Sequence, residues 1–199
     1  MSELVLTILS QNTSDANSGR AFMRLRTRFQ KWEELLAAGP EAIVAEIQVG
    51  GLARIKAPRI KAALEAVYER RGSFDIEFLR DLPLEEAKAW LRELKGVGPK
   101  TAACVLMFAL GRPALPVDTH VHRVAQRLGL VPAKAGPADA HDILEAVLKP
   151  DEVYAFHISL IKHGRRICRA QRPLCERCPL LDGCPAGQRL MRVRPELTG

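Results

Sequence analysis

Apolar side chains recur along most of this chain at intervals of three and four residues, the spacing that gathers them on one face of an α-helix. Between residues 17 and 31, for example, the repeat is carried by Ala21, Phe22, Leu25 and Phe29. The pattern predicts helices at residues 17–31, 32–38, 41–48, 57–70, 84–95, 99–110, 118–128, 137–148 and 151–163. No segment shows the alternation of a half-buried strand, so the predicted fold class is all-α with short loops.

Polar and glycine-rich stretches mark the points where the helical pattern breaks. The apolar run from Leu4 to Leu9 ends in SQNTSD, whose short polar side chains are typical of loops and helix N-caps. The segments VGGL, residues 49–52, and KGVGP, residues 95–99, are glycine turns. GRPALP, residues 111–116, has the composition of a linker.

Composition and charge narrow the class of protein. The chain has 199 residues, enough for one large domain or two small ones that share a groove. No apolar run reaches the roughly 18 residues of a membrane span, and no secretory signal opens the chain. A cytoplasmic, reducing compartment is therefore expected, where structural disulfides are rare. The net charge of +7 favours a polyanionic partner, above all nucleic acid, although the aromatic content of 5% disfavours a base-stacking single-strand binder.

Four of the five cysteines lie close together near the end of the chain. Cys168, Cys175, Cys178 and Cys184 have the spacing C-x6-C-x2-C-x5-C. Structural zinc usually uses two C-x2-4-C pairs, whereas only one such pair is present here. A compact loop of four thiolates also suits a [4Fe–4S] cluster, so the spacing alone leaves zinc and iron–sulfur open. The fifth, Cys104, lies in an apolar segment and is expected in the core.

The stretch LKGVGPKTA, residues 94–102, predicts a helix, a tight turn and a second helix. Gly96 and Gly98 permit positive φ and a close approach of the backbone. Their amides, together with the next helix N-terminus, form a potential site for a backbone phosphate. The alternative is a plain helical corner that needs two glycines for its geometry.

Taken together, LKGVGPKTA, the later VDTHVHR and the cysteine spacing resemble the endonuclease III branch of the helix-hairpin-helix DNA glycosylases. ILSQNTSD and VGGLARIKA resemble family segments as well, so the resemblance covers nearly the whole chain. It implies two helical lobes with a DNA-binding cleft between them. Residues 1–113 would hold the helix-hairpin-helix, at about 84–110, and residues 114–199 the cluster lobe with the catalytic aspartate. It also implies that the four cysteines bind a [4Fe–4S] cluster.

The same resemblance implies an enzyme of base excision repair. Lys100 matches the nucleophilic lysine that forms a Schiff base with the sugar, and Asp118 matches the carboxylate that stabilises positive charge on it. Asp118 is also expected to accept or shuttle a proton. The expected activity is removal of oxidised pyrimidines of the thymine-glycol type, followed by β-elimination. The alternatives are a relative specific for mismatched or alkylated bases, and a non-catalytic DNA-binding or redox-sensing iron–sulfur module. Without the family resemblance, the simplest interpretation is that Lys100 is a solvated lysine and that Asp118 is an ordinary N-cap.

Residues that contact DNA are expected in four places. Leu52 is the candidate wedge, with a core position as its alternative, and Gln11 or Asn12 is the candidate polar plug, Asn12 matching the usual family glutamine. The hairpin contributes Lys95, Gly96, Val97 and Gly98, and the loop between the first two cysteines contributes Arg169 and Arg172. Such contacts give affinity that falls with salt.

The remaining expectations concern the setting of the protein. The partner is double-stranded damaged DNA, the chain acts as a monomer, no membrane is involved, and the location is the cytoplasm, associated with a bacterial or archaeal nucleoid. Family members usually carry a further N-terminal segment before the equivalent of ILSQNTSD, whereas seven residues precede Ile8 here. The tail RVRPELTG is expected either to cover the surface that this segment would occupy or to stay exposed.

Overall fold

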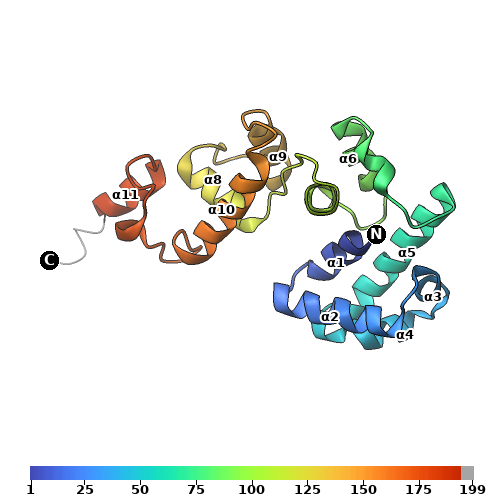
Figure 1. Cartoon of the computed structure of the whole chain (residues 1–199). Coiled ribbons are helices and arrows are strands. Elements are labelled where there is room, and N and C mark those ends of the chain that lie inside the picture. The colour runs from blue at the N-terminus through green and yellow to red at the C-terminus, as the bar shows by residue number, and fades with distance from the viewer. Residues whose placement is uncertain (194–199) are drawn as a thin grey trace. The chain divides into compact units, whose positions relative to one another are not determined.

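The computed structural model describes residues 1–193 and contains helices and no strand in that range, which confirms the all-α prediction (Figure 1). The α-helices are α1 (Ser2–Ser10), α2 (Asp15–Arg28), α3 (Trp32–Ala37), α4 (Pro40–Ile47), α5 (Ala53–Arg71), α6 (Leu84–Arg92), α7 (Pro99–Cys104), α8 (Thr119–Leu128), α9 (Pro137–Glu145), α10 (Val153–Arg166) and α11 (Pro185–Val193). Short 3₁₀ segments are η1 (Gln48–Gly50), η2 (Glu77–Arg80) and η4 (Cys175–Arg177), and η3 (Val105–Ala109) is π-helical. The greater part of the tail RVRPELTG lies outside the described residues.

Helix boundaries differ from the prediction where local geometry overrides the apolar repeat. The helix expected at 57–70 starts earlier, at Ala53, because the turn before it ends in a left-handed residue that lets the helix begin at once. The helix expected at 99–110 changes to π-helix after Cys104. Two elements were not predicted as helices, α1, which contains the apolar run 4–9, and α11, which starts at Pro185. Within residues 1–193, no helix is long and apolar enough to cross a membrane.

The chain divides into two compact units, residues 1–112 and 113–199, one residue from the expected boundary. In the first unit, α1 packs against α2, α5 and α7, and its residues Leu4, Val5, Ile8 and Leu9 are fully buried. The short apolar run at the start of the chain is therefore a core helix that the other helices surround. In the second unit, α8 and α10 pack against each other, and α8 also packs on α11.

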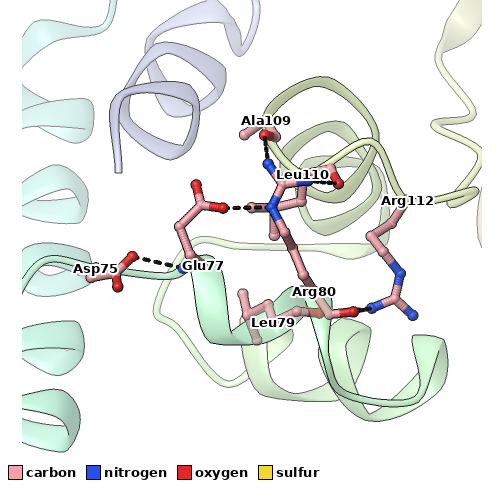
Figure 2. Close-up of polar contacts among 7 residues, drawn as sticks. All are labelled: Asp75, Glu77, Leu79, Arg80, Ala109, Leu110 and Arg112. Atoms are coloured by element: carbon pink, nitrogen blue, oxygen red, sulfur yellow. Dashed lines mark hydrogen bonds and ion pairs between the residues drawn. The ribbon is translucent and has the colours of Figure 1, made fainter.

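Two arginines, Arg80 and Arg112, form hydrogen bonds at the C-terminal end of the first unit (Figure 2). Arg80, in η2, donates to the carbonyl oxygens of Ala109 and Leu110 and pairs with Glu77. Arg112 donates from Nη1 to the carbonyl oxygens of residues 79, 80 and 82, at 2.8, 2.6 and 2.9 Å. The two side chains tie η2 to the end of η3 and so hold the segment that leads out of α7.

We expect Arg112→Ala to destabilise the first unit by about 2–3 kcal/mol, because it leaves three carbonyl oxygens without their charged donor. Urea unfolding followed by tryptophan fluorescence measures this unit selectively, since both tryptophans, Trp32 and Trp90, lie in it. Arg92→Ala, at an exposed position on α6, is the matched control and should change the free energy of unfolding by less than about 0.5 kcal/mol. Equal effects of the two substitutions would contradict the role given to Arg112.

Candidate active site and nucleic-acid interface

The two-glycine turn joins α6 to α7 and has a geometry that glycine alone allows at one position. Gly96 has a φ of +86°, and a Cβ there would lie 3.0 Å from Cδ of Arg59 on α5. The neighbouring Leu94 and Val97 are buried and anchor the turn to the first unit. Arg59 therefore packs directly against the turn, and any other side chain at position 96 would push it away.

The amides of the turn differ in whether they are free. The side chain of Val97 is 6% exposed and its amide donates to the carbonyl of Leu94 at 3.0 Å, so this amide is already bonded within the turn. Gly96 and Gly98 are exposed, and within residues 1–193 their amides have no acceptor. Free amides that precede a helix are the usual elements of a phosphate site.

Lys100 lies in the first turn of α7, half-buried, on an open hollow of the first unit. The hollow is lined by the turn itself and by basic side chains: Arg59, Arg92, Lys95 and Lys100. Glu93 is an acidic side chain in this lining, and it pairs with Arg70. The hollow is thus positively charged and suited to an anionic ligand.

The SQNTSD loop after α1 places the two candidates for the polar plug, Gln11 and Asn12, in different surroundings. The Gln11 side chain donates to the Gly96 carbonyl at 3.2 Å and to Thr101 at 3.4 Å, and accepts from Arg59 at 3.0 Å. Asn12 is exposed, and its side chain makes no hydrogen bond within residues 1–193. Gln11 therefore fixes the loop to the hairpin, which leaves Asn12 free to meet a ligand.

Leu52 and Asn12 share an uncommon backbone conformation. Their φ angles are 51° and 54°, in the left-handed region that costs a non-glycine residue about 1–2 kcal/mol. Leu52 is 48% exposed, so the alternative that it packs in the core is excluded. The chain thus holds one apolar and one polar side chain outward, at the ends of two neighbouring turns, in strained conformations that often accompany function.

Asp118 is the N-cap of α8 in the second unit. Its Oδ1 accepts from the amides of His120 and Val121, both at 2.8 Å. Both bonds end on the same oxygen, so Oδ2 has no donor among the described residues. One carboxylate oxygen thus holds the helix, and the other is available to a ligand.

The four cysteines of the C-terminal loop line one cavity between α8, α10 and α11. No group of three or more His, Cys, Asp or Glu side chains within residues 1–193 is arranged to hold a single metal ion. The sulfurs have nearby hydrogen-bond donors, as metal-bound thiolates require. Arg127 Nη1 lies 3.3 Å from Sγ of Cys168, and the Gly187 amide lies 3.3 Å from Sγ of Cys184. These residues fit an iron–sulfur cluster held by four thiolates.

Two basic side chains of α8 bind the main chain of the cluster loop. Arg127 donates to the carbonyls of Arg169 at 2.6 Å and Ala170 at 2.9 Å. Arg123 donates to the carbonyls of Cys168 at 3.1 Å and Gly164 at 3.0 Å. The helix that begins at Asp118 is therefore tied to the segment that carries the first cysteine.

Electrostatics oppose a metal-free loop with ionised thiols. Burial, reinforced by the charges of the other three thiolates, raises the pKa of Cys175. Burial also lowers the pKa of His163, whose Nε2 lies 3.6 Å from Sγ of Cys178, and this favours the neutral imidazole there. The positive charge of bound iron would offset the repulsion among the thiolates and so hold the loop together.

The remaining candidates in this loop lie on the surface. Arg169 and Arg172 are exposed, and Arg172 has a left-handed φ of 50°. Arg59 and Arg127 were missed by the sequence analysis, because the signal at each is only one basic residue on a helix. Cys104 is buried in α7 and is not among the residues that line the cysteine cavity, as expected for a core residue.

The helix-hairpin-helix, Lys100 and the cysteine loop define the class of this protein. A profile of HhH-GPD superfamily base excision DNA repair proteins matches residues 5–150, so the chain belongs to the HhH-GPD superfamily. A second profile, the iron–sulfur binding domain of endonuclease III, matches residues 168–184. Within the superfamily, the chain therefore has the [4Fe–4S] site of endonuclease III, and this confirms iron–sulfur over zinc.

Individual relatives agree with this assignment. Endonuclease III of Thermotoga maritima is 37% identical over 181 residues, which cover 91% of this chain and 80% of that protein. A solved non-covalent complex of endonuclease III with DNA is 32% identical, with a TM-score of 0.83 over 96% of this chain and 85% of that one. A candidate DNA glycosylase of Arabidopsis thaliana is 44% identical over 166 residues, although this chain spans only 56% of its length. The resemblance to endonuclease III is confirmed.

Proposed function

We propose that this protein is a bifunctional DNA glycosylase and abasic-site lyase that removes oxidised pyrimidines of the thymine-glycol type. The observation that carries the proposal is the position of Lys100. It is a half-buried amine in the first turn of a helix, beside free turn amides and within a basic hollow. An amine so placed meets the sugar of a nucleotide whose phosphate binds the turn.

The proposed reaction begins after the damaged nucleotide leaves the helix stack. Lys100 Nζ attacks C1′ as the bond from C1′ to the base breaks, and the departing base takes a proton from water. Asp118 Oδ2 stabilises the positive charge on the sugar, accepts the proton that the amine loses and passes it to the ring oxygen, so the ring opens to a Schiff base at C1′. Loss of a C2′ proton to water and cleavage of the bond from C3′ to oxygen release the 3′ phosphate, which nicks the strand on the 3′ side of the sugar. Hydrolysis of the Schiff base then frees Lys100.

The proposed partner is double-stranded damaged DNA, bound by one copy of the chain in the cytoplasm, at a bacterial or archaeal nucleoid. Leu52 enters the duplex as the wedge and Asn12 faces the orphaned base, since both are exposed at the ends of strained turns. Lys95, the amides of Gly96 and Gly98, Arg169 and Arg172 contact phosphates, which fix register without reading sequence. The solved relative that was bound to DNA is consistent with this partner.

Borohydride trapping on a panel of single-lesion duplexes tests the proposal. The wild-type protein should become covalently linked to duplexes that contain thymine glycol or an abasic site. Trapping on mismatched or alkylated duplexes with none on thymine glycol would instead favour the other specificity of the superfamily. A protein that contains the cluster, binds DNA and never traps would be a non-catalytic module, and the proposal would be wrong.

We expect Leu52→Gly to raise or maintain the stability of the first unit while it weakens damage recognition. Glycine relieves the left-handed strain, which is a change of up to about 1 kcal/mol in the free energy of unfolding. The loss of the wedge should lower affinity for a duplex with an abasic analogue by about tenfold or more. Urea unfolding and fluorescence anisotropy measure the two effects. Met23→Ala removes another exposed apolar side chain of this unit and should leave the affinity unchanged.

A further inference from the structure

One buried lysine, Lys56, joins the turn that carries Asn12 to the turn that carries Leu52. Lys56, in the first turns of α5, donates from Nζ to the Leu9 carbonyl at 2.6 Å and to the Gly50 carbonyl at 2.8 Å. The first carbonyl lies three residues before Asn12, and the second lies two residues before Leu52. We propose that Lys56 is a positioning residue that holds both turns in the arrangement that inserts into damaged DNA.

The cost of burying this lysine indicates a specific role. Lys56 is 1% exposed, and no carboxylate among residues 1–193 offsets the desolvation of its ammonium group. Burial lowers its pKa for this reason. A buried charge paired with carbonyls alone stabilises a fold poorly by comparison with an apolar side chain of the same size. The ammonium does supply several donors at one point, which an apolar side chain cannot do.

The Leu9 carbonyl belongs to the last turn of α1, where the carbonyls receive no hydrogen bond from a backbone amide of the same helix. The neighbouring carbonyls of that turn accept from donors in residues 10–13, and the Leu9 carbonyl accepts from Lys56. A cation at the C-terminal end of α1 also interacts favourably with the helix dipole. Lys56 therefore completes the C-terminus of α1 at the point where the Asn12 turn begins.

Lys56 contacts the Leu52 turn on both sides. Its amide donates to the Leu52 carbonyl at 2.9 Å, while its Nζ donates to the Gly50 carbonyl. Gly51 and Leu52 thus lie between two hydrogen bonds that Lys56 donates, and these bonds hold Leu52 in its left-handed conformation. A displacement of the ammonium group would release both turns together.

The experiment compares Lys56→Met with Lys61→Met. Lys61 is also on α5, and its Nζ donates to a single carbonyl, that of Ala38, far along the chain from both turns. The probe is 2-aminopurine opposite a tetrahydrofuran abasic analogue in a duplex, whose fluorescence rises when the base is unstacked. Wild type and Lys61→Met should give the full rise at saturating protein. Lys56→Met should give a rise about tenfold smaller, the size expected when hydrogen bonds from a charged donor are lost.

A second measurement separates positioning from general damage to the fold. Borohydride trapping on abasic DNA is compared between duplex and single strand, since a single strand needs no wedge. The ratio of duplex to single-strand trapping should fall about tenfold in Lys56→Met, whereas a loss of folded protein lowers both equally. If Lys56→Met does not fold, Lys56→Gln replaces it. Its shorter side chain retains a donor but does not reach both carbonyls, so it should also reduce the fluorescence rise.

The inference rests on the proposed function, and its outcomes are distinguishable from those of that function. A wild-type protein that gives the fluorescence rise without trapping would refute the lyase and leave the comparison of Lys56 variants valid. A full rise with either Lys56 variant would refute the role of Lys56 alone. The absence of any rise with wild type would refute the wedge and this proposal together.

Discussion

Replacement of Lys100 by alanine should abolish covalent trapping on abasic and thymine-glycol duplexes and lower strand cleavage by at least about a thousandfold. No other group is proposed to form the Schiff base, so base loss and cleavage both depend on this amine. The position of Lys100, half-buried in the first turn of α7, makes the substitution mild for the fold, because alanine is a good helix former. Gel-based cleavage and borohydride trapping measure the loss.

Lys95→Ala is the matched control for this prediction. It removes another lysine from the same hairpin, at an exposed position outside α7. Affinity for DNA should fall and its salt dependence should become shallower, while the protein that is bound still traps. Wild-type levels of trapping by Lys100→Ala would show that a different amine attacks, and the assignment of Lys100 would then be wrong.

Replacement of Cys175 by alanine should remove the cluster and with it the structure of residues 168–184. The four cysteine sulfurs line one cavity, and a bound cluster would join the segments that carry them, so a loop with three of the four ligands is expected to lose this connection. Because metal binding contributes directly to folding, the second unit should lose several kcal/mol of stability, on the order of what structural metal sites supply. Arg169 and Arg177 should then become sites of rapid tryptic cleavage.

Cys104→Ala separates loss of a ligand from loss of a cysteine. Cys104 is buried in α7 of the first unit, so its replacement costs about 1 kcal/mol through packing and should leave iron content and visible absorbance unchanged. Iron and sulfide assays, absorbance and timed digestion compare the two variants. Full iron content in Cys175→Ala would contradict the assignment of this residue as a ligand.

The residues with distinctive local patterns could be predicted from the sequence. Asp118 as an N-cap follows from its position before an apolar-periodic segment, and the turn at Gly96 follows from two glycines between helical repeats. The spacing of the four cysteines indicated a shared site but left its metal open. That choice came from the family resemblance and from the profile that matches residues 168–184.

The residues that depend on distant contacts could not be predicted. Whether Gln11 or Asn12 faces outward is decided by Arg59, Gly96 and Thr101, which are 48 to 90 positions away in the sequence. The burial of Lys56 depends in the same way on the packing of α1 against α5. The inward direction of the Val97 side chain, which was expected among the DNA-contacting residues of the hairpin, likewise depends on the geometry of the tight turn. The apolar repeat shows which face of a helix is buried, but it does not show which residues from distant parts of the sequence come into contact.

Only one oxygen of Asp118, Oδ1, caps α8, and this has a consequence for inherited variation. Asparagine caps a helix about as well as aspartate, so an allele with the substitution Asp118→Asn would keep α8 and pass any screen based on protein abundance or thermal stability. If Asp118 acts as proposed, the amide that replaces the carboxylate would carry no negative charge to stabilise the sugar. On that proposal, such an allele would encode an abundant protein that occupies lesions without clearing them, and would obstruct other repair enzymes more than a null allele does.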